Sequence, residues 1–142
     1  MSPQAFDQLK RDLRRDEGER AKPYVDTVNK ITIGVGRNLT DIGLSPDEIE
    51  LLLDNDCARA FALASTFPWF PALDDVRQRV VLNLAFNLGS QLLQFHDTLG
   101  AIARGAYVVA ADALQHSKWF SQVGRRGPRL VAMLRTGKDP NG

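Results

Sequence analysis

The chain has 142 residues, with 18 basic and 17 acidic side chains and a net charge of +1. This length suits one compact unit with a substantial core, and the near-neutral charge does not indicate a nucleic-acid-binding protein. The opening residues lack the apolar core of a secretion signal, and no stretch approaches the ~20 apolar residues that a membrane span needs.

Charge is unevenly distributed along the chain. Residues 1–98 carry 11 basic and 15 acidic side chains, whereas residues 99–142 carry 7 and 2. The basic end suits an anionic polymer such as the bacterial wall, a nucleic acid, or simply a solvated surface. Cys57 is the single cysteine, so no intrachain disulfide can form. Its place on the apolar side of an expected helix predicts packing in the core.

An opening helix is expected to end in a carboxylic acid. Phe6, Leu9 and Leu13 recur at helical spacing. Glu17 is the next position on this stripe, directly before Gly18, which suits the residue that ends a helix. Partial burial and the negative end of the helix dipole both disfavour a charged carboxylate there. Glu17 is therefore expected to stay protonated and to suit the role of a general acid.

A β-hairpin is expected after this helix. Residues 24–27 and 31–33 read as two short strands around a three-residue loop, in which Asn29 takes positive φ. In that register Asp26 faces Thr32, and directly opposed residues point to the same side of the ribbon. The aspartate carboxylate and the threonine hydroxyl are therefore expected to hold one water between them.

These side chains together predict hydrolytic chemistry. Gly34 and Gly36 leave the following strand without side chains, where a ligand can approach closely. A protonated Glu17 on one side, with Asp26 and Thr32 on the other, is what hydrolysis of a glycosidic bond requires. The alternative is a capping Glu, a turn Asp and a strand Thr that are all solvated, and the spacing alone does not exclude it.

A long helix is expected over residues 45–65. Ser45 suits the N-cap, Pro46 the first helical position, and Glu48 closes a capping box. The helix is long enough to connect two lobes. In the proline-rich segment that ends it, Trp69 suits either sugar stacking or packing, and we favour packing.

The rest of the chain predicts a helical lobe. Residues 76–88 are apolar on nearly every side, which predicts a buried central helix. Asn83 and Asn87 are its polar exceptions, and Asn87 either faces a cleft or is a satisfied core amide. Short helices follow, punctuated by glycines. His96 and His116 lack metal-ligand spacing, so neither a metal nor another cofactor is expected.

Together these residues resemble the phage lysozyme family typified by the T-even phages, glycoside hydrolase family 24. The resemblance rests on the motifs D-E-G, Y-V-D-T, T-I-G-V-G, F-N-L-G and K-W-F and on the arginines after them, and it covers nearly the whole chain. It implies an α+β, mostly α-helical, lysozyme-like fold with two lobes. The expected parts are a small β-containing lobe at about 15–45, a connecting helix at about 45–65, and a helical lobe at about 66–142 that the N-terminal helix completes.

The resemblance implies a catalytic triad. The expected reaction is endo hydrolysis of the β-1,4 bond between N-acetylmuramic acid and N-acetylglucosamine in peptidoglycan, with inversion at the anomeric carbon. Glu17 would protonate the leaving oxygen. Asp26 with Thr32 would orient and activate water on the opposite face.

Further positions take roles by resemblance alone. Phe86 and Thr98 are similar to sugar-contacting positions of the family, and Arg126 resembles the arginine that pairs with the catalytic Glu. The family usually has His where this chain has Arg37, so the β-containing lobe must be fastened differently here. The link between the hairpin and the long helix also looks shorter than in larger members.

The resemblance also implies partners and location. The expected partner of a monomeric enzyme is bacterial peptidoglycan, without nucleic-acid binding or membrane insertion. The protein would be made in the host cytoplasm without a signal peptide and reach the wall after holin-type release, or it would be part of a virion. The alternatives are a lytic transglycosylase, which cleaves the same bond without a positioned water, and a non-catalytic module that binds cell wall or nucleic acid.

Overall fold

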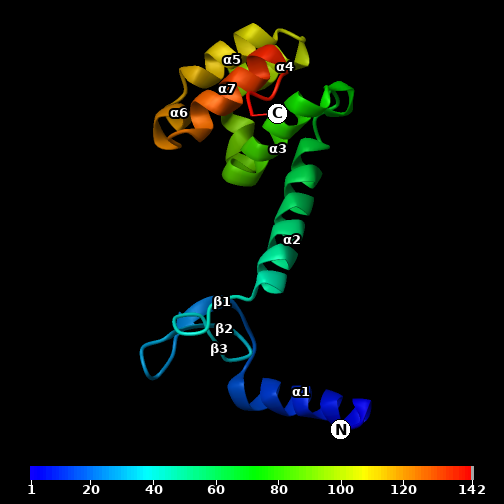
Figure 1. Cartoon of the computed structure of the whole chain (residues 1–142), viewed down its shortest axis with the longest axis vertical. Helices are drawn as coiled ribbons and strands as arrows, with labels where there is room; N and C mark the ends of the chain where they lie inside the picture. The colour runs from blue at the N-terminus through cyan, green and yellow to red at the C-terminus, as the bar shows by residue number, and fades with distance from the viewer. Residues whose placement is uncertain (142) are drawn as a thin grey trace. The chain divides into compact units, whose positions relative to one another are not determined.

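The computed structural model describes residues 1–141, which divide into two compact units (Figure 1). Unit 1 covers residues 1–51 and unit 2 begins at residue 52. The described residues form seven α-helices and one three-stranded antiparallel sheet, so the predicted α+β, mostly helical class is confirmed. None of these helices is both long and apolar enough to cross a bilayer.

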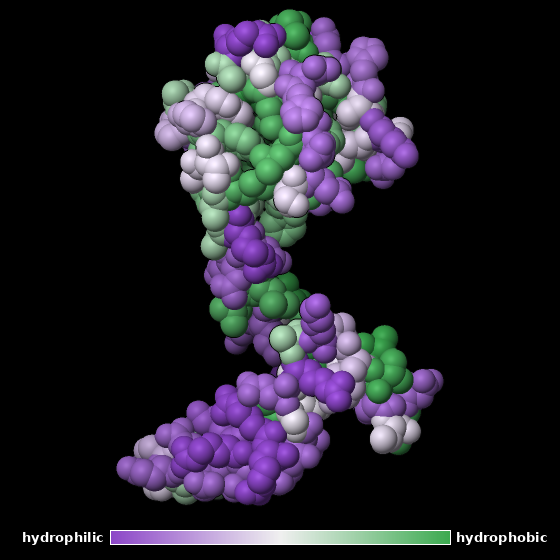
Figure 2. Space-filling view, turned by 180° about the vertical axis from the view of Figure 1, so that it is seen from behind, coloured by the Kyte–Doolittle hydropathy of each residue, from purple (hydrophilic) through white to green (hydrophobic). Residues whose placement is uncertain are grey.

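Helix α1 (Pro3–Glu17) opens unit 1. The hydroxyl of the N-cap Ser2 accepts a backbone N–H of the first turn, and Gly18 ends the helix with a φ of 79°. The predicted end at Glu17 is therefore confirmed. No side chain of α1 is buried, including its apolar stripe, and the face of α1 in Figure 2 is largely hydrophilic. The expected assignment of this helix to the helical lobe stays a prediction.

The sheet of unit 1 has the strand order β1-β2-β3 and is antiparallel throughout. Its strands are β1 (Arg20–Val25), β2 (Ile31–Gly34) and β3 (Arg37–Asn38). Tyr24 pairs with Thr32 across the first two strands. The sequence predicted a strand that contains Gly34 and Gly36, but not a separate strand of two residues at Arg37–Asn38.

The predicted hairpin register, with Asp26 opposite Thr32, is wrong. Tyr24 occupies the position opposite Thr32, because Asp26 belongs to the loop and not to the strand. The loop is residues 26–30, and the Asp26 N–H closes it by donating to the Lys30 carbonyl oxygen at 2.9 Å. Asn29 takes the predicted positive φ, at 64°.

Gly34 at the end of β2 and Gly36 after it flank a turn instead of lying in the expected open strand. Gly34 ends β2 with a φ of 67°, and Gly36 has a φ of 68° just before β3 begins. Both conformations are in the region that favours glycine. The chain therefore reverses here and brings Arg37 alongside Ile33.

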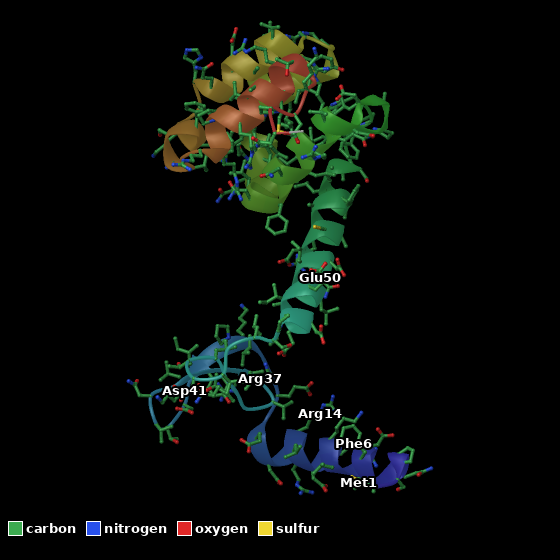
Figure 3. All side chains as sticks on the ribbon, viewed as in Figure 1. Met1, Phe6, Arg14, Arg37, Asp41 and Glu50 are labelled. Carbon is green, nitrogen blue, oxygen red and sulfur yellow. The ribbon has the colours of Figure 1, made fainter. Side chains whose placement is uncertain are left out.

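Arg37 fastens the sheet to the start of helix α2 (Pro46–Ala64). Its Nη1 donates to Glu48 Oε1 at 2.7 Å and to the Gly43 carbonyl oxygen at 3.1 Å (Figure 3 labels Arg37). The predicted capping box is confirmed, since the Ser45 N–H donates to the same Oε1 at 2.9 Å and the Glu48 N–H donates to Ser45 Oγ at 3.2 Å. The Glu48 carboxylate thus links strand β3 to the start of α2.

Helix α3 (Asp75–Leu88) contributes buried side chains to the unit 2 core and packs against α7. Asp74 is its N-cap, and Val80, Val81 and Leu84 are fully buried. The predicted buried helix is confirmed. Near its end Phe86 and Asn87 are exposed, Phe86 with 45% of its surface.

The other helices of unit 2 pack in a chain of contacts. Helix α4 packs against α5, α5 against α7, and α7 against α3 (Figure 1). Their bounds are α4 (His96–Ala103), α5 (Tyr107–Gln115), α6 (Lys118–Gln122) and α7 (Arg126–Thr136), with short 3₁₀ helices at η1 (Phe70–Ala72) and η2 (Gly89–Gln94).

Arg77 joins three of these helices. Its Nε donates to the Leu134 carbonyl oxygen at 2.8 Å and its Nη2 to the Arg135 carbonyl oxygen at 3.1 Å. These are carbonyls of the last turn of α7, which have no partner within the helix. The guanidinium also lies 3.8 Å from the centroid of the Tyr107 ring at the start of α5.

Two predictions about the region around the end of α2 have different outcomes. Cys57 is exposed, so its predicted core position is wrong. The reason is that α2 contributes only Ala60 and Ala64 to the core. Trp69 packs as expected, stacked on Phe67 with ring centroids 4.9 Å apart, and both rings lie against the core.

Candidate active site

Glu17 lies against the turn between β2 and β3. A Cβ atom added at Gly36 would lie 3.0 Å from Glu17 Oε2 and 3.3 Å from its Cδ. The carboxyl group thus occupies the space that a side chain at position 36 would fill. Glu17 is exposed, in contrast to the predicted partial burial, because α1 buries none of its side chains.

Asp26 is held by the backbone of its own loop. Its Oδ1 accepts the Lys30 N–H at 2.8 Å and the Val28 N–H at 3.0 Å. Within residues 1–141 the structure records no side-chain hydrogen bond to Oδ2, so the second oxygen can accept a hydrogen bond from a ligand. The half-buried carboxylate is therefore fixed in place by two donors, with one oxygen to spare.

Thr32 is bound to the same loop from the neighbouring strand. Its hydroxyl donates to the Lys30 carbonyl oxygen at 3.1 Å, and the residue is only 3% exposed. Lys30 therefore bonds both residues, through its N–H to Asp26 and through its C=O to Thr32. The structure links the predicted pair through this shared partner and not through the expected strand register.

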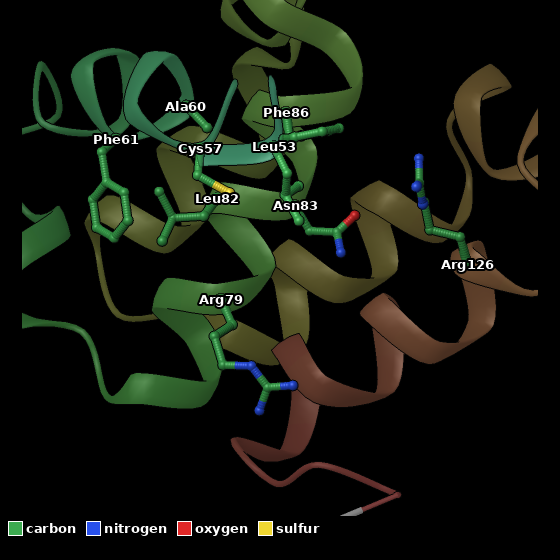
Figure 4. Close-up of a pocket in the computed structure, with 9 residues that line it drawn as sticks. All are labelled: Leu53, Cys57, Ala60, Phe61, Arg79, Leu82, Asn83, Phe86 and Arg126. Atoms are coloured by element: carbon green, nitrogen blue, oxygen red, sulfur yellow. The ribbon is translucent and has the colours of Figure 1, made fainter. Parts of the chain in front are cut away.

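Phe86 and Arg126 line one hollow of unit 2, with a volume of about 360 Å³ (Figure 4). Its walls are largely apolar side chains of α2 and α3, including Leu53, Phe61 and Leu82. Glu17 and Arg126 belong to different units, so the expected pairing between them stays a prediction.

Thr98 lines another hollow of unit 2. It is 3% exposed on α4, and the hollow of about 360 Å³ beside it is also lined by His96 and His116. The structure thus does not bring Thr98 into the hollow that Phe86 and Arg126 share. Nowhere in residues 1–141 do three or more His, Cys, Asp or Glu side chains form a group that could hold a metal ion.

The sequence did not predict a hydrogen bond between Trp119 and Asn87. The buried Trp119 donates its Nε1–H to Asn87 Oδ1 at 2.8 Å. A buried indole needs an acceptor, so the sequence did contain a signal for a partner. It could not identify that partner, which is 32 positions away.

Comparison with known proteins agrees with the family resemblance of the sequence motifs. The family model for phage lysozyme matches residues 14–135. The chain is 25% identical to probable T4-type lysozyme 1 of Dictyostelium discoideum, covering 88% of this chain and 92% of that protein. It is 28% identical to probable T4-type lysozyme 2 of the same organism, covering 91% and 94%. It is also 27% identical to the pre-baseplate central spike protein Gp5 of Enterobacteria phage T4, over 88% of this chain but only 27% of that protein.

Proposed function

The chain belongs to the phage lysozyme family, and on that premise we propose that it is an endo-acting N-acetylmuramidase. It cleaves the β-1,4 bond between N-acetylmuramic acid and N-acetylglucosamine in peptidoglycan. The family supports hydrolysis of peptidoglycan, as do relatives named as lysozymes over most of their length. The observation that carries the mechanism is that Asp26 and Thr32 bond to one loop residue in the unit that also holds Glu17.

Glu17 is the general acid of this mechanism. Its carboxyl group is exposed and therefore accessible to a glycan oxygen. The absence of a side chain at Gly36 leaves the carboxyl group its place beside the turn, because a Cβ atom there would lie 3.0 Å from Glu17 Oε2. Protonation of the leaving oxygen by a positioned acid lowers the barrier to cleavage.

Asp26 and Thr32 hold the attacking water. Since the Thr32 hydroxyl donates to the Lys30 carbonyl, its remaining lone pairs can only accept. Asp26 Oδ2 is also an acceptor. A water that donates one hydrogen to each of them keeps a lone pair free for the anomeric carbon, and Asp26 takes up the proton as the bond forms.

We propose inversion because water attacks from the face opposite the acid. Inverting glycosidases place their carboxyl groups about 6.5–9.5 Å apart, which leaves room for that water. In this mechanism Phe86 and Thr98 bind sugar rings. The biological role is lysis of the host cell after release to the wall, or penetration of the wall as a virion part. The relative named as a phage spike protein supports the second use.

Product analysis with a matched pair of variants tests this function. Purified peptidoglycan is digested with the wild type, Glu17→Gln and Glu19→Gln, and new reducing ends are counted. Glu17→Gln should lose about 10²–10⁴-fold of the rate. Glu19, which pairs with Arg14 on the surface, is the control and should keep the rate.

The digestion products separate the alternatives. Hydrolysis adds one water for each bond that it cleaves, whereas a lytic transglycosylase adds none and leaves an anhydro sugar that mass spectrometry identifies. Anhydro products would contradict the hydrolase. A non-catalytic binder would release no reducing ends, and its effect on walls would survive Glu17→Gln. The anomer formed first, measured by proton NMR, decides between inversion and retention.

A further inference from the structure

The turn after β3, at residues 39–42, holds the end of the hairpin loop. Its Thr40 Oγ1 accepts the Ile31 N–H at 2.9 Å. Its Asp41 Oδ1 accepts a hydrogen bond from Lys30 Nζ at 3.3 Å. The turn therefore binds both the backbone next to Lys30 and the charged end of the Lys30 side chain (Figure 3 labels Asp41).

The Asp41 carboxylate is itself held in place. Asn38 Nδ2 donates to Asp41 Oδ2 at 3.0 Å, and the Asp41 N–H donates to Asn38 Oδ1 at 3.0 Å. One oxygen of Asp41 thus binds Asn38, and the other receives the Lys30 ammonium. The side chains of Lys30 and Asp41 are 37% and 53% exposed. Ion pairs this exposed add little to stability, so stability alone does not explain the arrangement.

Lys30 also lies beside a second carboxylate, that of Asp26. The Lys30 N–H donates to Asp26 Oδ1 at 2.8 Å, so the base of the lysine side chain is close to that carboxylate. The stem of a lysine is flexible, and its ammonium carries three donors. Asp26 Oδ2, the oxygen proposed to bind water, accepts no side-chain hydrogen bond that the structure records within residues 1–141. Asp26 and Asp41 therefore compete for one ammonium, and the structure places it on Asp41.

An ammonium on Asp26 would impair the proposed base in two ways. It would occupy the oxygen to which the attacking water donates. It would also favour the charged form of the carboxylate, and a carboxylate stabilised in this way is a weaker base. The backbone of Lys30 thus positions Asp26 and Thr32, whereas its side chain can block the same site.

We propose that Asp41 is a positioning residue of the reaction. It holds the Lys30 ammonium away from Asp26, so that Asp26 Oδ2 stays free for water. This inference rests on the proposed function, because it concerns the base of the same mechanism. Asp41 itself touches neither the water nor the sugar in this role and acts only through Lys30.

A double-mutant cycle of Asp41 and Lys30 tests this role. The release of reducing ends from soluble, uncross-linked peptidoglycan strands gives kcat and KM. Asp41→Asn keeps the size of the side chain and an oxygen for Asn38, but its NH₂ group then faces the ammonium. We expect kcat to fall about 3- to 10-fold, a part of the ~10²–10⁴-fold that a positioned base supplies, with KM unchanged.

The second side of the cycle removes the ammonium. Lys30→Gln keeps the backbone bonds to Asp26 and Thr32. In the Lys30→Gln background, the further change Asp41→Asn should leave kcat unaltered, because no ammonium remains to be held. A loss of kcat that is equal in both backgrounds would show that Asp41 only supports the turn, and it would overturn the proposal. No loss in either background would overturn it as well.

Three further variants keep the outcomes distinct. Asp41→Glu keeps the charge and should retain most of the wild-type kcat. Asp41→Ser repeats the cycle with a smaller uncharged side chain. Lys22→Gln removes an exposed ammonium of β1 instead, so the loss caused by Asp41→Asn should persist in that background.

Two readouts separate this inference from stability and from the proposed function. Melting curves give the folded fraction to which each kcat is normalised, and Tm should stay close to the wild-type value because the ion pair is exposed. A wild type that releases no reducing ends would overturn the muramidase. A muramidase whose kcat does not depend on Asp41 would overturn this inference alone.

Discussion

Gly36 leaves the space that the Glu17 carboxyl group occupies. A Cβ atom at position 36 would lie 3.0 Å from Glu17 Oε2, closer than such contacts normally are. The Glu17 side chain at the end of α1 therefore fits against the turn between β2 and β3 only because position 36 has no side chain. Under the proposed mechanism, the position of the acid depends on a residue that takes no part in proton transfer.

Gly36→Ala should therefore impair catalysis more than stability. The added methyl group must displace the Glu17 carboxyl, and we expect kcat to fall about 10-fold or more, on the scale of one positioned acid. Gly34→Ala is a matched control. Gly34 has nearly the same φ, 67° against 68°, but nothing lies within 4 Å of its added Cβ. Both variants should lose about 1–2 kcal/mol of stability through backbone strain. Equal loss of kcat in both would contradict the steric explanation.

The Arg37–Glu48 pair should make unit 1 sensitive to acid only at low pH. The hydrogen bond from Arg37 and the backbone N–H of Ser45 lower the pKa of Glu48 from its ordinary 4.5 to about 2. A lowered folded-state pKa adds stability that is fully present above pH 4.5 and is lost as the pH falls toward 2. Both side chains are 36% exposed, so salt should weaken the pair.

Thermal unfolding of the wild type and Glu48→Gln at a series of pH values checks this expectation. The wild type should have the higher Tm above pH 4.5, and the difference should shrink steadily between pH 4.5 and pH 2. Arg37→Gln should reduce the same difference. If the Tm difference stays constant over this pH range, Glu48 stabilises the helix start through its hydrogen bonds alone, and its negative charge contributes nothing.

In unit 1, the sequence predicts hydrogen bonds within one helical turn better than it predicts the pairing of strands. The Ser45–Glu48 capping box could be predicted because its bonds lie within one helical turn. The hairpin register could not, because the Asp26 carboxylate binds the loop backbone and removes Asp26 from the strand. A five-residue and a three-residue loop fit the same pattern of strand residues.

The burial of α2 and the contacts between distant residues could not be predicted from the sequence either. The stripe that places Cys57 on the apolar side of α2 does not say which length of the helix is covered, and only Ala60 and Ala64 are buried. The Asn87–Trp119 bond joins two helices far apart in the sequence. The triad residues themselves were found by spacing and resemblance, and their roles remain proposals.

Arg77→Ala should be among the more destabilising changes in unit 2. The side chain is only 14% exposed and donates to two carbonyls at the end of α7. Its removal leaves those carbonyls unpaired, which should cost about 2–4 kcal/mol in urea denaturation. Arg79 is the control, because it is 59% exposed and pairs with Asp139 on the surface. Arg79→Ala should cost less than about 1 kcal/mol, and similar losses in both variants would contradict the role of Arg77.

Asp26 has a structural and a proposed catalytic role that two substitutions can separate. Asp26→Asn keeps an oxygen that can accept the Val28 and Lys30 N–H groups but removes the negative charge. It should keep the hairpin and lower kcat about 10²–10⁴-fold. Asp26→Ala removes both functions and should lower kcat as much, with a further loss of about 1–2 kcal/mol in stability.

Substitutions of Thr32 test whether its hydroxyl helps to hold the attacking water. Thr32→Ser keeps the hydroxyl and should retain most of the activity, whereas Thr32→Val removes it and should lower kcat about 10-fold or more, because the water loses one of its two acceptors. Steady-state rates on purified peptidoglycan, beside melting curves for the same variants, give both quantities. If Thr32→Val stays fully active while Asp26→Asn does not, Asp26 holds the water by itself and the threonine serves only to fix the Lys30 carbonyl of the loop.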